Sequence, residues 1–199
     1  MKHLLLFSIL VMFFSFSCKK EPQPIEREIM VIETDYGNIN IDLFENVAPN
    51  HVKVIKELVN NKFYDGLYFH RVIPGFVVQG GDPNSRDNDK SNDGMGQDSQ
   101  PTINAEFSKI SHKRGIVSMA RKGNDINSAT SQFFICVADI PSLDNQYSVF
   151  GKVIEGMDVI DKIVNVERDR NDNPIKPVYM KKVYLKKMMI VPSIENEKE

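Results

Sequence analysis

The sequence predicts a mainly β protein built around an antiparallel sheet that is closed or nearly closed on itself. Short segments rich in β-branched and aromatic residues recur along the chain between turn residues, whereas only two segments show helical periodicity. The chain has 199 residues with 41% hydrophobic content, which suits one main domain. Such a domain is large enough to fill a barrel with side chains.

The first two strands are expected to form a hairpin. The segment Ile29–Thr34 is rich in β-forming residues, and Asn38–Phe44 alternates apolar and polar side chains, as a half-buried strand does. Gly37 stands in the turn signal between them.

A helix follows this hairpin. Asn46 is a candidate N-cap, and Pro49 suits the first turn, where its missing N–H is not needed. One face of the helix is apolar and consists of Val52, Ile55, Leu58 and Val59. A second, shorter helix is predicted over Met157–Val164.

The other β segments are Tyr68–Arg71, Phe76–Gln79, Gly115–Ala120, Gln132–Val137, Val149–Glu155 and Val178 to about Ile190.

Between two of these segments, Asp82–Pro101 is polar and without periodicity, which predicts a long surface loop. From Asp89 this loop reads D-x-S-x-D-G, the opening of a calcium loop. However, Gln100 stands where the bidentate glutamate belongs, and no helices flank the segment. We therefore favour a solvated loop, and we expect no metal or cofactor.

The N-terminus predicts export. Residues 1–17 have a basic start and an apolar run, Leu4–Phe16, that is shorter than the roughly 20 residues a membrane-spanning helix needs. Small Ser17 before Cys18 resembles a bacterial lipoprotein processing site, which implies cleavage before Cys18 and acylation of its thiol. The alternatives are a signal peptide without a lipid and an uncleaved anchor; we favour the lipid.

This N-terminus sets the expected organisation of the chain. Residues 18–28 read as a tether, residues 29–192 as the folded domain and residues 193–199 as a disordered tail. We expect a monomer held on the bacterial cell envelope through Cys18, facing the periplasm. The net charge of −2 without a basic stripe gives no indication of a nucleic-acid partner. Cys136 lies in an apolar run, so we expect it to be buried and unpaired.

Five motifs occur in order, at 69–82, 115–121, 127–135, 143–144 and 149–153: FHRVIPGFVVQGGD, GIVSMAR, NSATSQFFI, LD and VFGKV. Together they resemble the cyclophilin-type peptidyl-prolyl cis–trans isomerases, over about residues 29–191. The resemblance implies a closed eight-stranded antiparallel β-barrel capped by two α-helices. It also implies an active groove on the outer face of the barrel.

The resemblance assigns the catalytic role to Arg71. It places substrate-binding residues at Phe76, Val77, Gln79, Ala120, Arg121, Gln132, Phe134, Leu143 and Tyr147. Val77, Tyr147 and Arg121 replace the methionine, histidine and asparagine common in eukaryotic members. Ser142 replaces an aromatic residue, often tryptophan, which puts cyclosporin binding in doubt.

The chemistry expected of these residues is the isomerisation of X–Pro bonds, which assists the folding of exported proteins. Arg71 is always charged and presents a rigid fork of donors to a twisted amide. Gln79 lies two residues past Val77 on one strand, so both face the same way and Gln79 can orient Arg71.

Two other interpretations stay open. Arg71 could be a structural ion-pair residue, and Phe76 and Phe134 could be ordinary core residues; Phe133, which faces the opposite way, is the expected core residue. The protein could also be a proline-peptide binding module or holdase whose catalysis is incidental.

The histidines are expected to take no part in catalysis. His70 should be packed and hydrogen-bonded, and His51 and His112 should lie on the surface.

Overall fold

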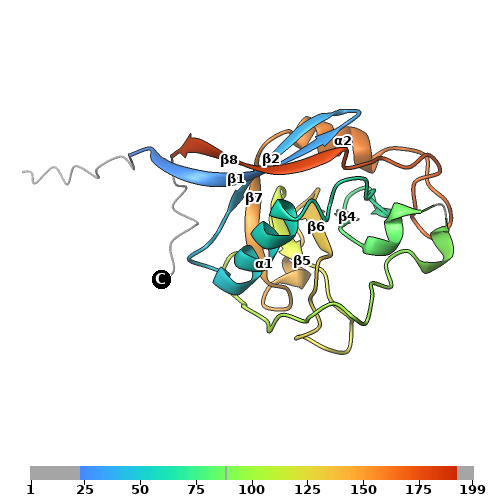
Figure 1. Cartoon of the computed structure of the whole chain (residues 1–199), viewed down its shortest axis with the longest axis horizontal. Helices are drawn as coiled ribbons and strands as arrows, with labels where there is room; N and C mark the ends of the chain where they lie inside the picture. The colour runs from blue at the N-terminus through green and yellow to red at the C-terminus, as the bar shows by residue number, and fades with distance from the viewer. Residues whose placement is uncertain (1–22, 88, 192–199) are drawn as a thin grey trace, which may run out of the picture.

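The computed structural model describes residues 23–87 and 89–191 (Figure 1). Its eight strands are β1 Ile25–Thr34, β2 Gly37–Leu43, β3 Arg71–Val72, β4 Val77–Gly80, β5 Ile116–Met119, β6 Phe133–Cys136, β7 Val149–Glu155 and β8 Lys182–Ile190. The helices are α1 Pro49–Asn60 and α2 Met157–Val164. Three 3₁₀ turns are η1 Pro83–Arg86, η2 Lys90–Asn92 and η3 Pro141–Leu143. The predicted signal peptide, Cys18 and the predicted tail 193–199 lie outside the described residues.

All strand pairs are antiparallel, in the order β3-β4-β6-β5-β7-β2-β1-β8. The eight antiparallel strands and two helices are confirmed, but a closed barrel is not, because β3 and β8 are the two ends of this order. The segments just before these two strands do meet. Phe69 N–H donates to Val178 O at 3.1 Å, and Met180 N–H donates to Leu67 O at 2.7 Å. A two-residue β3 is too short to extend this contact into a ladder.

Several boundaries differ from the sequence pattern. Strand β1 begins at Ile25, so residues 25–28 of the predicted tether pair with β8. The strand expected over Tyr68–Arg71 is only an isolated bridge at Tyr68, and β3 begins at Arg71. Both β7 and α2 span the residues predicted for them.

Helix α1 is held at its N-terminus by a distant carboxylate rather than by the predicted cap at Asn46. The N-cap residue is Ala48, without a side-chain hydrogen bond, and Pro49 occupies the first turn as predicted. Glu106 accepts hydrogen bonds from His51 N–H at 3.0 Å and from the His51 ring Nδ1 at 2.6 Å. The prediction that His51 lies on the surface is therefore wrong, since its side chain is fully buried. Burial opposes ionisation of Glu106, but its hydrogen bonds to His51 outweigh this and lower its pKa.

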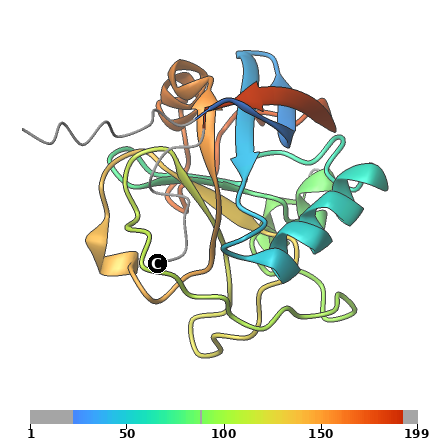
Figure 2. The same ribbon diagram turned by 90° about the vertical axis from the view of Figure 1, so that its left-hand side faces the viewer.

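The core lies inside the curved sheet, and Figure 2 shows α1 and α2 on different sides of it. The largest fully buried side chains include Tyr64, Phe69, Phe133 and Phe150.

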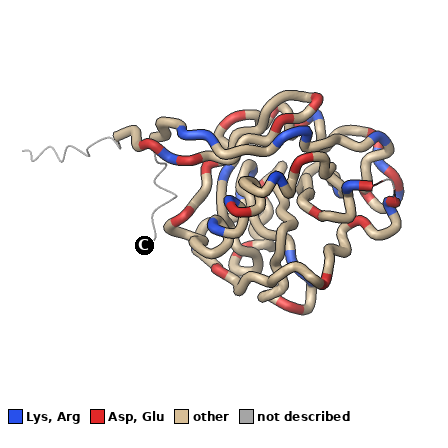
Figure 3. Tube along the Cα trace, viewed as in Figure 1, with Lys and Arg blue, Asp and Glu red and all other residues tan. Residues whose placement is uncertain are grey.

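Lys and Arg are interspersed with Asp and Glu along the trace in Figure 3. Within residues 23–87 and 89–191, no helix is long and apolar enough to cross a membrane.

Candidate active site

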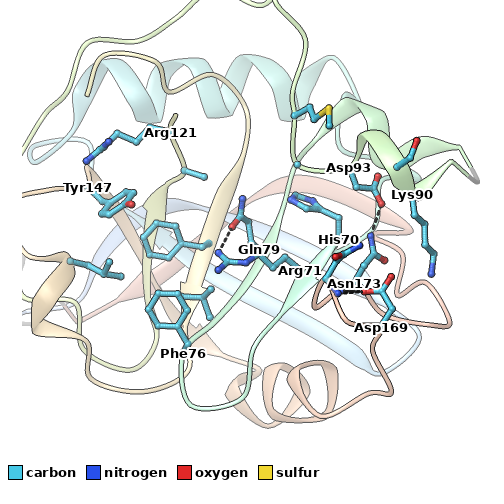
Figure 4. Close-up of a pocket in the computed structure, with 18 residues that line it drawn as sticks. His70, Arg71, Phe76, Gln79, Lys90, Asp93, Arg121, Tyr147, Asp169 and Asn173 are labelled. Atoms are coloured by element: carbon cyan, nitrogen blue, oxygen red, sulfur yellow. Dashed lines mark hydrogen bonds between the residues drawn. The ribbon is translucent and has the colours of Figure 1, made fainter. Parts of the chain in front are cut away.

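A groove of about 660 Å³ opens on the outer face of the sheet (Figure 4). Nine of the ten predicted site residues line it, namely Arg71, Phe76, Val77, Gln79, Ala120, Arg121, Phe134, Leu143 and Tyr147. Gln132, the tenth, lines a neighbouring pocket that shares Gln79, Ala120 and Arg121 with the groove. The structure thus brings together the ten residues predicted for catalysis and substrate binding.

The register of the sheet places the polar and apolar parts of the groove side by side. Arg71 on β3 pairs with Gln79 on β4, Gln79 pairs with Phe134 on β6, and Phe134 pairs with Ser118 on β5. Directly paired residues share a face of the sheet. This row of four side chains therefore faces the groove side, while neighbouring Phe133 faces the core, as predicted.

Arg71 is half-buried and bound to a neighbouring glutamine. Its Nη1 donates to Gln79 Oε1 at 3.2 Å, and its guanidinium lies 5.8 Å from the centre of the Phe76 ring. No carboxylate among the described residues forms an ion pair with Arg71. The structural ion-pair interpretation of Arg71 therefore finds no support in this part of the chain.

A relay of amides fixes the orientation of Arg71. Gln79 Nε2 donates to Gln132 Oε1 at 3.1 Å, and Gln132 Nε2 donates to Gly94 O at 3.1 Å. Each amide both accepts and donates, so the Gln79 oxygen is turned toward the arginine. The relay ends on the backbone of the loop that covers this side of the groove.

The apolar part of the groove is a socket of aliphatic and aromatic side chains. Its buried members are Val77 and Phe134, and its half-buried members are Phe76, Ala120, Leu143 and Tyr147; buried Cys136 and Ile140 pack in the same cluster without lining the groove. The rings of Phe134 and Tyr147 meet edge to face at 5.3 Å. Cys136 is a buried free thiol whose pKa is raised to about 12, chiefly by burial, so the expectation of a small hydrophobe is confirmed.

A family profile described as "Cyclophilin type peptidyl-prolyl cis-trans isomerase/CLD" matches residues 29–185. The chain belongs to the cyclophilin-type peptidyl-prolyl cis–trans isomerases. It is 46% identical over 138 residues to the "Probable peptidyl-prolyl cis-trans isomerase" of Brucella suis biovar 1 (strain 1330), covering 67% of this chain and 70% of that protein. It is 40% identical over 167 residues to "Peptidyl-prolyl cis-trans isomerase A" of Dickeya dadantii (strain 3937), covering 81% and 84%.

Solved cyclophilin structures agree with this assignment. A crystal structure of a Cryptosporidium parvum cyclophilin type peptidyl-prolyl cis-trans isomerase, determined in the presence of the dipeptide Ala-Pro, matches with a TM-score of 0.72. The two are 30% identical, and the match covers 79% of this chain and 98% of that one. This cyclophilin is accordingly an isomerase of peptidyl-prolyl bonds.

Beneath the cyclophilin groove lies a buried network that sequence reasoning missed. His112 Nδ1 lies 2.9 Å from Asp144 Oδ1, and His112 Nε2 lies 3.0 Å from Ser118 Oγ. These residue types also form nucleophilic triads, but Ser118 is fully buried and cannot reach a substrate. The His112 ring instead stacks under Phe134 at 6.1 Å and supports the floor of the socket. The prediction that His112 lies on the surface is wrong.

One further expectation needs correction near Arg71. His70 is packed as predicted, but neither ring nitrogen has a hydrogen-bond partner.

The loop at 82–101 is anchored by fully buried Asp82, whose carboxylate accepts from Asn84 N–H at 3.1 Å and also from Gly94 N–H. Among the described residues, no group of three or more His, Cys, Asp or Glu side chains could hold a metal ion. Asp89 of the calcium-like motif caps the turn at Ser91.

The buried histidines predict a loss of stability on mild acidification. Burial is the main reason that the pKa values of His51, His70 and His112 are lowered from 6.5. Below about pH 6.5 the unfolded chain takes up these protons before the folded chain does, so the free energy of unfolding falls as the pH falls through this window. Glu106 and Asp144 also have lowered pKa values, and they add a further loss only below their ordinary values of 4.5 and 3.8.

We expect a lower Tm at about pH 5.5 than at about pH 7.5, measured by circular dichroism. Replacing His112 by glutamine removes one of the three titrating rings, so His112→Gln should show a smaller difference between the two pH values. An identical pH dependence in both proteins would exclude a contribution from His112.

Proposed function

We propose that Arg71 stabilises the twisted X–Pro amide while the apolar socket holds the proline ring. The observation that carries this proposal is the state of Arg71: a half-buried cation, held by the Gln79 relay, with no carboxylate to neutralise it among the described residues. A guanidinium in this setting keeps N–H groups available for a substrate.

The physics of the amide explains why such a cation is needed. Rotation about the C–N bond breaks resonance at a barrier of about 18–20 kcal/mol and returns a lone pair to the prolyl nitrogen. A fixed donor can bond to that nitrogen only in the twisted state, so it stabilises the transition state more than either planar isomer. No acid, base or nucleophile is required.

The socket supplies the other part of the proposed mechanism. Its rings and aliphatic chains offer apolar contact to a proline ring, and Phe76 and Phe134 fix where the ring sits relative to Arg71. Ala120 and Arg121 flank the groove with backbone groups for the polypeptide. The Arg121 side chain is held at the wall of the groove, since it donates to Gln146 O at 3.0 Å and lies 4.8 Å from the centre of the Tyr147 ring.

The proposed substrates are exported proteins. The N-terminal pattern that ends at Cys18 supports a lipoprotein of the bacterial cell envelope in which the isomerase domain is tethered by a few residues. Strand β1 starts at Ile25, so at most six residues separate Cys18 from the sheet, a reach of roughly 20 Å when extended. The groove would then work close to the membrane surface, on chains emerging from export.

The test uses the full-length chain and its Cys18→Ser variant in a bacterial envelope. We expect the wild type to accelerate cis-to-trans exchange of an Ala-Pro peptide and to fractionate with membranes. Cys18→Ser should retain the catalytic rate but leave the membrane fraction. A variant that stays with the membranes would refute the lipid anchor, and a wild type that binds the peptide without accelerating exchange would favour the binding-module alternative.

A further inference from the structure

The groove does not end at Arg71. It continues into a polar basin on the side away from the apolar socket (Figure 4). The basin is lined by His70, Lys90, Asp93, Asp169, Asn171 and Asn173. These residues come from three separate parts of the chain: the end of the Tyr68–Arg71 segment, the loop 82–101 and the loop between α2 and β8. Nothing in the mechanism at Arg71 uses them.

Two donors of the basin already bind oxygens of the protein. Lys90 Nζ donates to Pro174 O at 2.6 Å and to Ile175 O at 3.1 Å. Asn173 Nδ2 donates to Asp93 Oδ2 at 2.6 Å. The Lys90 and Asn173 donors are therefore engaged with carbonyl and carboxylate oxygens of the protein itself.

The acceptors are not all committed. Asp169 Oδ1 accepts backbone hydrogen bonds from Asn171 at 2.8 Å and from Asn173 at 3.1 Å. Its second oxygen has no partner among the described residues, and the side chain is half-buried at the rim. Asp93 Oδ1 and Asn173 Oδ1 are also without partners, but both of these atoms are buried.

Two buried side chains reinforce this imbalance. His70 and Asn173 are each only 4% exposed, both lie against the groove, and each carries unpartnered polar atoms. A buried polar group that makes no hydrogen bond costs stability, and such groups concentrate where a ligand is to be bound. The basin thus combines unused acceptors at its rim with unsatisfied polar atoms in its wall.

We propose that this basin binds the ammonium or guanidinium group of a lysine or arginine that flanks the proline in the substrate polypeptide. The inference rests on the proposed function in one respect: a proline in the socket directs the adjoining chain along the groove past Arg71. Arg71 and Lys90 also line this groove, so selectivity comes from a directed hydrogen bond to the free oxygen of Asp169 rather than from net charge.

Peptide kinetics test the proposal. In an Ala-Pro peptide series, lysine is compared with its uncharged analogue norleucine at each of the three positions before the alanine and the three positions after the proline. We expect kcat/KM of the wild type to be roughly tenfold higher with lysine than with norleucine at one or more positions. This is the selectivity that one charge-assisted hydrogen bond can supply. Asp169→Asn should reduce this ratio toward one while keeping the Oδ1 acceptor that holds the loop.

Asp172→Asn is the matched control. It removes the same charge from the same loop, but the Asp172 carboxylate is bound by Arg168 Nε at 3.2 Å and does not line the groove. Its φ of 63° is one that asparagine tolerates well. The lysine preference should therefore survive in Asp172→Asn.

A second variant guards against misfolding of Asp169→Asn. Asn171 is exposed at the basin rim, and Asn171→Lys places a cation there without altering either carboxylate. It should abolish the preference by occupying the basin. Equal ratios in wild type, Asp169→Asn and Asn171→Lys would overturn the inference while leaving the isomerase mechanism intact. A wild type that accelerates no peptide would instead refute the proposed function.

Discussion

Replacing Arg71 by alanine should lower kcat/KM for an Ala-Pro peptide by roughly 10²–10³, which corresponds to about 3–4 kcal/mol of lost transition-state stabilisation. The reason is that a bond to the prolyl nitrogen exists only when the amide is twisted, so its loss raises the barrier without weakening the planar complex. Exchange can be followed by NMR, and peptide affinity by chemical-shift titration of the same samples. Affinity should change much less than rate.

Two further variants separate the guanidinium from charge alone. Arg71→Lys keeps the cation but loses the rigid fork that Gln79 orients, so its rate should lie between those of wild type and Arg71→Ala. Arg170→Ala removes an exposed arginine that does not line the groove and should leave the rate unchanged. If Arg71→Ala were as fast as Arg170→Ala, Arg71 would have no part in catalysis.

Sequence reasoning located this groove well because its residues lie on neighbouring strands. Alternation along β4 placed Gln79 and Val77 on one face, and alternation along β6 separated Phe134 from Phe133. The pairing of Arg71 with Gln79 across β3 and β4 follows from a short local turn. Such period-two patterns and turn signals can be recognised within a few residues.

The contacts missed by sequence reasoning join residues that are far apart in the chain. His112 binds Asp144, which is 32 residues away in the sequence, and His51 binds Glu106, which is 55 residues away. No local sequence pattern therefore indicates that either ring is buried. The composition of the loop at 82–101 predicts only a polar surface segment. It does not reveal that the Asp82 carboxylate is buried and binds Gly94 N–H, because an aspartate is expected in solvent. The hydrogen bonds between the segments that precede β3 and β8 likewise join distant parts of the chain.

Adjacent Phe133 and Phe134 should respond to alanine in different ways. Phe133 is fully buried in the core, with its ring 5.8 Å from that of Tyr64 and 6.4 Å from that of Phe150. Phe133→Ala should lower the free energy of unfolding by about 3–5 kcal/mol, because the cavity left behind cannot collapse fully. In a domain of this size that corresponds to a fall in Tm of roughly 10 °C or more.

Phe134→Ala should act mainly on catalysis. Its ring forms the socket with Val77 and meets Tyr147, so truncation removes apolar contact from the bound proline and lowers kcat/KM roughly 10- to 100-fold. Water can enter the open groove where the ring stood, so the loss of stability should be smaller than in Phe133→Ala.

The comparison depends on both variants being folded. Thermal melts and urea unfolding measure stability, and exchange kinetics below the melting transition measure the activity of the folded fraction. Phe133→Leu leaves a smaller cavity and replaces Phe133→Ala if the latter does not fold. Folded Phe133 variants should retain near-normal kcat/KM, since this ring faces away from the groove. If Phe134→Ala lost stability but kept its rate, Phe134 would be an ordinary core residue and the proline would have to bind elsewhere.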